Sequence, residues 1–206
     1  MADKKHKGHH HPDLSHLPSD AALRVRALES LLVEKGLARP ETIDKYVEKF
    51  EHEVGPHNGA RVVARSWVDA EFRKRLFDNA TLAIEDMSVL GAQASDVVAV
   101  ENTDTVHNVV VCTLCSCYPW TLLGIPPSWY KSHAYRSRVV REPRAVLEEF
   151  GVGLAEGVEV RVWDSTAEIR YLVVPQRPHG TENMSEEQLA ALVSRDSMIG
   201  AARVEA

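Results

Sequence analysis

Hydrophobic residues recur at helical spacing through the N-terminal part of the chain. One stretch begins after Ser19 and ends at Gly36, and its apolar face holds Ala21, Val25, Leu28 and Leu32. A second helix is predicted from Pro40 to about Gly55, and residues 58–87 continue in broken helical periods. Amphipathic helices of this kind pack on a partner or on their own domain.

The pattern changes near Gly91, where short apolar runs typical of strands begin. Residues 97–100 and 106–111 flank a turn-like segment and predict a hairpin, whose second strand leads into the cysteines of the chain. The other predicted elements are strands at residues 158–162 and 169–174, and helices around Trp129, at residues 143–150 and after Ser185, which starts a capping box. We therefore expect an α+β fold, with a helical N-terminal arm and a mixed α/β C-terminal domain that carries the cysteine loop after a strand.

This pattern divides the chain into three parts. They are a disordered, His-rich tail (1–18), a helical region that packs on a partner subunit (19–90) and an α/β metal-binding catalytic domain (91–206). The tail holds five of the ten histidines, at His6, His9, His10, His11 and His16. It either collects metal for the cysteines or binds divalent ions without a dedicated role.

Composition narrows the class of protein only slightly. Hydrophobic residues make up 44% and charged residues 26% of the 206 residues, as in a globular protein with a real core. The net charge of -6 argues against nucleic acid as a partner. Since the sequence shows neither a signal peptide nor an apolar run long enough to span a membrane, we expect a cytoplasmic protein whose cysteines stay reduced or bind metal.

All three cysteines lie in the segment Cys112-Thr113-Leu114-Cys115-Ser116-Cys117, which we call the cysteine claw (residues 112–117). An odd number of cysteines this close together does not build a disulfide framework, and a zinc site would lack its fourth ligand. The i, i+2 spacing instead allows the thiolates of Cys115 and Cys117 and the backbone nitrogens of Ser116 and Cys117 to bind one metal, with Cys112 as an axial ligand. Deprotonated amides require a strongly Lewis-acidic, trivalent ion, so we expect Co(III) or Fe(III).

Such a site is anionic, because the sulfur ligands and the amidates together outweigh the charge of a trivalent metal. Guanidinium groups suit it, since their planar fork donates two hydrogen bonds. Arg136, Arg138 and Arg141 follow the cysteine claw closely in sequence. Each is either such a donor or an ordinary surface or interface charge.

The cysteine claw and the Tyr118-Pro119-Trp120 that follows it resemble the nitrile hydratase alpha subunit. Further resemblance runs along most of the chain, at Val54-Gly55-Pro56-His57, Val100-Glu101-Asn102-Thr103, residues 135–140, Val162-Trp163-Asp164, residues 175–178 and Ser197-Met198-Ile199-Gly200. The resemblance implies a lyase that hydrates small nitriles to amides, built as an αβ heterodimer or α2β2 tetramer with a beta subunit that supplies arginines. It also implies a metal-inserting activator protein, a sulfinate at Cys115, a sulfenate at Cys117 and, because Thr113 stands where the iron enzymes carry Ser, one Co(III) ion per alpha subunit.

Catalytic roles follow from this resemblance for Cys115, Ser116 and Cys117. The metal would polarise the nitrile, and either an activated hydroxide or the Cys117 sulfenate would attack it. Gln93 and Trp120 match substrate-pocket residues of the family. An exposed loop position explains Gln93 equally well, whereas for Trp120 we favour the pocket over core packing. Likewise, Asp164 and Glu168 match acidic residues around the metal ligands, or they are a strand-end turn and a surface charge.

Two alternatives remain. The chain is also similar to a thiocyanate hydrolase subunit, which has the same kind of claw. A non-catalytic zinc or copper module would use the three cysteines with His107 or the tail. We expect His107 to be structural, because its odd spacing from Cys112 places the two side chains on opposite faces of a strand.

Overall fold

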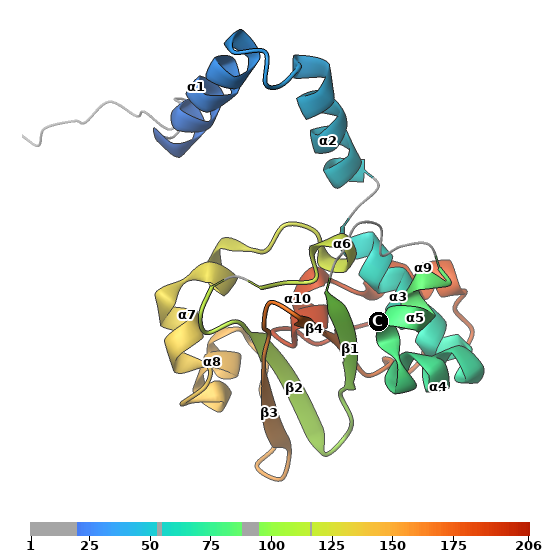
Figure 1. The fold of residues 1–206 in the computed structure, drawn as a ribbon. Helices are drawn as coiled ribbons and strands as arrows, with labels where there is room; N and C mark the ends of the chain where they lie inside the picture. Colours follow the sequence, from blue (N-terminus) through green and yellow to red (C-terminus); the bar gives the residue numbers. More distant parts are fainter. Residues whose placement is uncertain (1–19, 53–54, 88–94, 116) are drawn as a thin grey trace, which may run out of the picture. The chain divides into compact units, whose positions relative to one another are not determined.

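The computed structural model describes residues 20–52, 55–87, 95–115 and 117–206, and Figure 1 shows the path of the chain. The chain forms two compact units, Met1–Val47 and Glu48–Ala206. The first unit contains α1 (Asp20–Glu34), and α2 (Pro40–His52) crosses from the first unit into the second. Both predicted helices are confirmed. Helix α1 exposes the apolar side chains of Leu23, Val25, Leu28, Leu31 and Leu32.

The second unit opens with three helices, α3 (Pro56–Val68), α4 (Ala70–Asp78) and α5 (Ala80–Glu85). The side chain of Asp69 accepts a hydrogen bond from the backbone N–H of Phe72 and so caps α4. The side chain of Asn79 caps α5 in the same way. These caps explain the broken helical periods of residues 58–87. The second compact unit begins at Glu48 and includes these three helices together with the strands, whereas the predicted boundary lies after residue 90.

Within the described residues, four strands form two parallel pairs. Strand β1 (Asp96–Glu101) pairs with β4 (Ile169–Val174), and β2 (Val106–Val111) pairs with β3 (Glu159–Asp164). In the second pair, Val111 lies opposite Asp164. The ends of β2 and β3 therefore lie side by side at the point where the cysteine claw begins.

The predicted hairpin of β1 and β2 is wrong, although both strands are present. Each of the two strands pairs with a later one, because side chains take over the hydrogen bonds that a hairpin ladder would use. Asn108 donates from Nδ2 to the carbonyl of Glu101 at 2.6 Å, and its backbone N–H donates to Oδ1 of Asn102 at 2.7 Å. Hydrophobic periodicity does not reveal these asparagine contacts.

Helices cover both sides of the strands. Between β2 and β3 the chain forms α6 (Trp120–Leu123), the 3₁₀ helix η1 (Ser128–Lys131), α7 (His133–Arg138) and α8 (Pro143–Glu149). After β4 come α9 (Glu186–Leu192), which starts with the predicted capping box at Ser185, and α10 (Arg195–Ile199). Helices α7 and α8 lie on one side of the strands, and α3, α5 and α9 lie on the other (Figure 1). The core fills the space between them, where α3 packs against α6 and α9.

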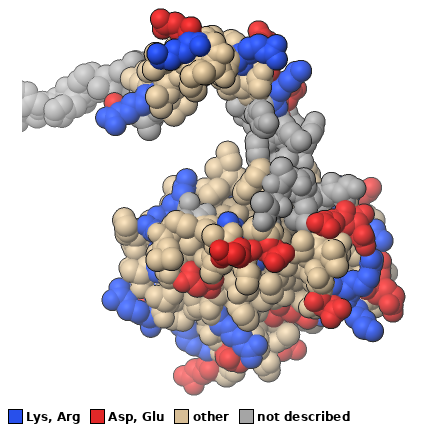
Figure 2. Space-filling view, in the orientation of Figure 1, with Lys and Arg blue, Asp and Glu red and all other residues tan. Residues whose placement is uncertain are grey.

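The mixed helix and strand fold agrees with the predicted α+β class. Helices α6, α7 and α10 were not predicted, because each is shorter than two turns and shows no clear helical period. Acidic and basic side chains are interspersed over the face of the second unit seen in Figure 2. Within the described part of the chain, no helix combines the length and the hydropathy that a membrane span requires.

Candidate metal centre

The cysteine claw begins at the end of a buried strand. Val111 is fully buried and Cys112, the next residue, is only 1% exposed. The loop then rises to the surface, where Leu114 is 91% exposed and Cys115 is exposed, while Cys117 is partly buried. The claw therefore has one cysteine fixed in the core and two that solvent or a partner can reach.

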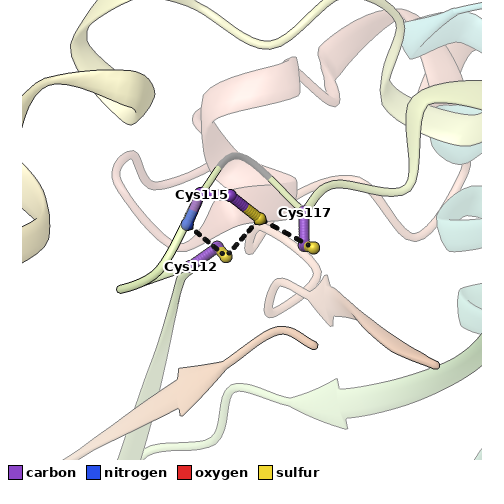
Figure 3. A group of neighbouring side chains, drawn as sticks. All are labelled: Cys112, Cys115 and Cys117. Carbon is purple, nitrogen blue, oxygen red and sulfur yellow. Dashed lines mark hydrogen bonds between the residues drawn. The ribbon is translucent and has the colours of Figure 1, made fainter. Parts of the chain in front are cut away.

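The three sulfurs of the claw converge on one point (Figure 3). Their Sγ atoms lie within 4.8 Å of one another, with Cys115 at 3.4 Å from Cys112 and at 3.2 Å from Cys117. The three cysteines, all among the described residues, form no disulfide. The backbone N–H of Cys115 donates to the Cys112 sulfur at 3.3 Å, so the loop is folded around that sulfur. This arrangement presents three soft ligands to a single ion.

The surroundings of Cys117 oppose a lone thiolate. Burial, with hydrogen bonding to Cys115 and the nearby Cys112, raises the pKa of the Cys117 thiol to about 12. The guanidinium of Arg170, on β4, acts in the opposite direction and lowers this pKa. Three neighbouring thiolates need a cation between them, because like charges at this separation repel strongly.

A trivalent ion fits this donor set better than zinc. The described residues bring three thiols together, without a fourth His, Cys, Asp or Glu within the same cluster. Tetrahedral zinc sites use four side-chain ligands, whereas the backbone nitrogen of Cys117 lies within the loop itself. The backbone nitrogen of Ser116, predicted as another ligand, lies outside the described residues.

Asp164 fastens the first turn of the claw. Its Oδ1 accepts from the backbone N–H of Thr113 at 2.9 Å, and its Oδ2 accepts from the Thr113 hydroxyl at 2.5 Å. Since Asp164 ends β3 opposite Val111, the strand pairing places its carboxylate beside the loop. The two hydrogen bonds fix the chain directly after Cys112.

Three side chains of η1 and α7 hold carbonyl groups in and beside the claw. The hydroxyl of Tyr135 donates to the carbonyl of Val110 at 2.6 Å, and the hydroxyl of Tyr130 donates to that of Cys117 at 2.9 Å. Nη1 of Arg136 donates to the carbonyl of Cys115 at 3.2 Å. The claw backbone is therefore supported before, within and at the end of the loop.

Other predicted site residues lie in different surroundings. Trp120 starts α6 three positions after Cys117 and is 37% exposed. Glu168 is exposed and accepts a hydrogen bond from the hydroxyl of Thr166 within the turn between β3 and β4. Gln93 lies outside the described residues.

His107 is structural, as expected. Its Nε2 lies 2.8 Å from the carbonyl of Gly200, so this nitrogen carries the proton and donates. Its Nδ1 then accepts from Nδ2 of Asn102 at 3.4 Å. Burial lowers the pKa of His107, which keeps the ring neutral. With both nitrogens engaged, His107 is not a fourth metal ligand.

Two residues near the claw were not predicted from the sequence. Tyr130 is fully buried and packs edge-on against Tyr118, with ring centroids 5.1 Å apart. Arg170 lies on β4, more than fifty residues after the claw. Neither residue belongs to a motif that signals metal chemistry, and only the packing of η1 and β4 brings them to Cys117. Their hydroxyl and guanidinium groups were the only available signal.

Two cavities of the second unit lie away from the claw. One, of about 580 Å³, is lined by His107, Arg177 and Arg203, and another, of about 490 Å³, is lined by Trp67 and Arg73. Residues 102–104 border both, so these cavities open at the start of β2 rather than at its end. Neither cavity includes a cysteine of the claw.

Comparison with known proteins agrees with this geometry. The family model described as nitrile hydratase, alpha chain, matches residues 19–202. The chain is 57% identical over 194 residues to the low-molecular weight cobalt-containing nitrile hydratase subunit alpha of Rhodococcus rhodochrous, covering 93% of this chain and 94% of that relative. It is 42% identical over 207 residues to thiocyanate hydrolase subunit gamma of Thiobacillus thioparus, covering 89% of this chain and 80% of that one.

A solved structure shows the same arrangement of the chain. A double mutant of the Fe-type nitrile hydratase from Comamonas testosteroni Ni1 superimposes with a TM-score of 0.84 at 43% identity, over 92% of this chain and 93% of that one. The similarity therefore extends through both the fold and the segment that carries the cysteine claw.

Proposed function

Because the chain belongs to the nitrile hydratase alpha-chain family, we propose that it is the alpha subunit of a cobalt nitrile hydratase, a lyase that hydrates nitriles to amides. The convergence of three sulfurs within 4.8 Å, at the end of a buried strand, carries this proposal. Cys112, Cys115 and Cys117 would hold the metal, together with the backbone nitrogens of Ser116 and Cys117. When bound, Co(III) supplies Lewis acidity toward the nitrile. The cobalt-containing relative at 57% identity supports this metal.

The depth of each cysteine supports a different chemical fate for its sulfur. Oxidation follows the exposure and thiolate character of a cysteine. Cys112 is 1% exposed, and we expect it to remain a thiolate. Cys115 is exposed and Cys117 is partly buried, so we expect a sulfinate at Cys115 and a sulfenate at Cys117. Oxygen atoms on these two sulfurs would face the open side of the loop.

The remaining residues would complete the site around the sulfurs. Asp164 holds the Thr113 turn and so orients Cys112. Trp120, exposed at the start of α6, would form one wall of the substrate pocket, and Gln93 would contribute to the same pocket. Glu168, in the turn before β4, would be one of the acidic residues around the metal ligands. The Ser116 hydroxyl would orient water.

A beta subunit would close the site. Leu114 at the tip of the claw is 91% exposed and Ile125 is 68% exposed, and we expect the beta subunit to cover both side chains. The exposed apolar face of α1 would pack on the same partner. We infer an αβ heterodimer, alone or doubled, loaded with cobalt by an activator protein in the cytoplasm, where thiols stay reduced.

The experiment is to express the chain with its beta subunit in cobalt medium and to measure metal, peptide mass and products together. We expect one cobalt per alpha chain, three added oxygen atoms on the peptide that spans Cys112 to Cys117, and conversion of a nitrile to its amide. Zinc or copper with three unmodified cysteines would refute the proposal. Release of carbonyl sulfide from thiocyanate, without amide formation, would instead identify a thiocyanate hydrolase.

A further inference from the structure

Helix α7 carries a cationic side chain, Arg136, which belongs to the alpha chain and not to the beta subunit. We propose that Arg136 is a positioning residue of the cysteine claw, which fixes the carbonyl of Cys115 and offsets part of the negative charge of the loaded site. The inference rests on the proposed function, because the metal-loaded, oxidised claw is what carries this charge. It adds a support from the alpha chain itself.

The contacts of Arg136 point toward the claw. Nη1 donates to the carbonyl of Cys115 at 3.2 Å, and Nη2 donates to Nδ1 of His133 at 3.2 Å. The carbonyl of Cys115 belongs to the same peptide group as the backbone nitrogen of Ser116, a predicted metal ligand. A guanidinium on this oxygen therefore holds the Cys115 carbonyl and places a positive charge beside it.

The charge of Arg136 is not cancelled within the described chain. Arg138 pairs with Glu142 at 2.5 Å and with Glu149 at 2.6 Å. Among the described residues, no carboxylate pairs with Arg136. Because no described carboxylate offsets its charge, the Arg136 guanidinium stabilises the anionic loop to which it is hydrogen bonded.

One nitrogen of Arg136 still lacks an acceptor. Its Nε is buried, and the described residues offer it no hydrogen-bond partner. Buried N–H groups in folded proteins almost always have an acceptor. The oxygen atoms of the oxidised cysteines would have the chemistry of such an acceptor.

Helix α7 holds Arg136 in a defined position. The neighbouring Tyr135 is buried, and its hydroxyl is hydrogen bonded to the carbonyl of Val110 on β2 at 2.6 Å. Trp129 packs edge-on against Tyr135, with ring centroids 4.9 Å apart. Ser132 caps the helix by accepting from the N–H of Tyr135. The helix that carries Arg136 is therefore fastened to the strand that carries the claw.

The test compares three variants of the alpha chain in complex with its beta subunit. Arg136→Gln removes the charge, Arg136→Lys keeps the charge without the planar fork, and Arg141→Gln is the matched control. Arg141 follows α7 and donates to the carbonyl of Ser137 at 2.9 Å. Each complex is loaded with cobalt, and cobalt loss to a chelator is timed together with the oxygen count on the claw peptide. The thermal midpoint of each complex, expressed without cobalt, reports folding alone.

We expect Arg136→Gln to lose cobalt about 10 to 100 times faster than the wild type, in line with groups that orient metal ligands. Arg136→Lys should lie between the two, and Arg141→Gln should match the wild type. The cobalt-free midpoints of Arg136→Gln and Arg141→Gln should agree.

Three results would overturn the inference. Cobalt retention in Arg136→Gln equal to that of the wild type would remove Arg136 from the site, and so would equal losses in Arg136→Gln and Arg141→Gln. If Arg136→Gln fails to fold, Arg136→Lys takes its place in the test. Cobalt retention of Arg136→Lys equal to that of the wild type, together with a lowered cobalt-free midpoint of Arg136→Lys, would make the role of Arg136 purely structural. A wild-type complex without cobalt would instead refute the proposed function and this inference with it.

Discussion

Strand β2 has a polar cluster at each end, and the two clusters differ in how complete they are. At its start, the side chains of Asn102, His107 and Asn108 bond to one another and to the backbone. At its end, three sulfurs converge on one point, and Arg136 keeps a buried N–H without an acceptor among the described residues. The complete cluster fixes the strand, whereas the other cluster offers sulfur ligands to a metal.

We expect the largest effect from a substitution in the claw itself. Cys115→Ala removes the sulfur that bridges the other two in space, so the complex should lose tight cobalt binding and more than about 100-fold in activity, a larger effect than for groups around the ligands. Cobalt analysis and amide formation measure both losses. The cobalt-free complex should melt at the wild-type temperature, because this side chain is exposed. Activity that survives this substitution would refute the metal site.

The complete cluster should respond in stability rather than in metal binding. Asn108→Ala removes the acceptor of the Trp163 indole N–H, 2.8 Å away, and the donor to the Glu101 carbonyl. Leaving these buried groups unpaired should cost about 3 kcal/mol, read from urea unfolding of the cobalt-free complex. The exposed Asn183→Ala is the control and should change the free energy of unfolding by less than about 0.5 kcal/mol. Equal values for both variants would contradict a structural role for this cluster.

Two carboxylates sharpen the comparison within the open end. Asp164→Asn keeps the size of the side chain but replaces one acceptor of the Thr113 hydrogen bonds by a donor, so cobalt affinity should fall about 10 to 100-fold. Glu168→Gln changes an exposed side chain that contacts Thr166. It should have a smaller effect on cobalt retention in the same assay. A larger effect for Glu168→Gln would reverse the order of importance proposed for the two carboxylates.

The smallest effect should be the pH dependence of the complete cluster. The pKa of His107 is lowered in the folded chain from its ordinary value of 6.5. Below pH 6.5 the unfolded chain therefore takes up a proton that the folded chain does not, so stability is full above this pH and is lost as the pH falls. The loss should not exceed about 1.4 kcal/mol per pH unit. Urea unfolding of the cobalt-free complex at pH 7.5 and 5.5 measures it.

His107→Gln is the control for this pH dependence, since its amide stays neutral at both pH values. The difference in stability between the two pH values should shrink in this variant. An unchanged difference would show that other groups govern the acid sensitivity of the fold.

Local patterns predicted the elements better than their pairing. The ends of β2 and β4 and the capping box at Ser185 follow from neighbouring residues, and the structure confirms them. The parallel partners do not follow, because β2 pairs with a strand more than forty residues away, across the helices between them. The choice depends on asparagine side chains that replace the expected hairpin bonds.

The site shows the same division. The spacing of three cysteines within six residues is local, so the sequence alone predicts the cluster of sulfurs that the structure shows. The contact of Asp164 with Thr113 and that of Arg136 with the Cys115 carbonyl join residues 51 and 21 positions apart. Only the structure distinguishes Arg136, which pairs with no described carboxylate, from Arg138, which forms ion pairs with two glutamates.

Four side chains that support the claw backbone in the described structure follow the claw in the sequence, at Tyr130, Tyr135, Arg136 and Asp164. Synthesis proceeds from the N-terminus, so the ribosome releases the cysteines before these four groups. A chain that has emerged only as far as Cys117 carries the cysteines on a loop without these contacts. The Asp164 contact forms only after β3 has been synthesised and has paired with β2, so the support of the claw is completed late in translation.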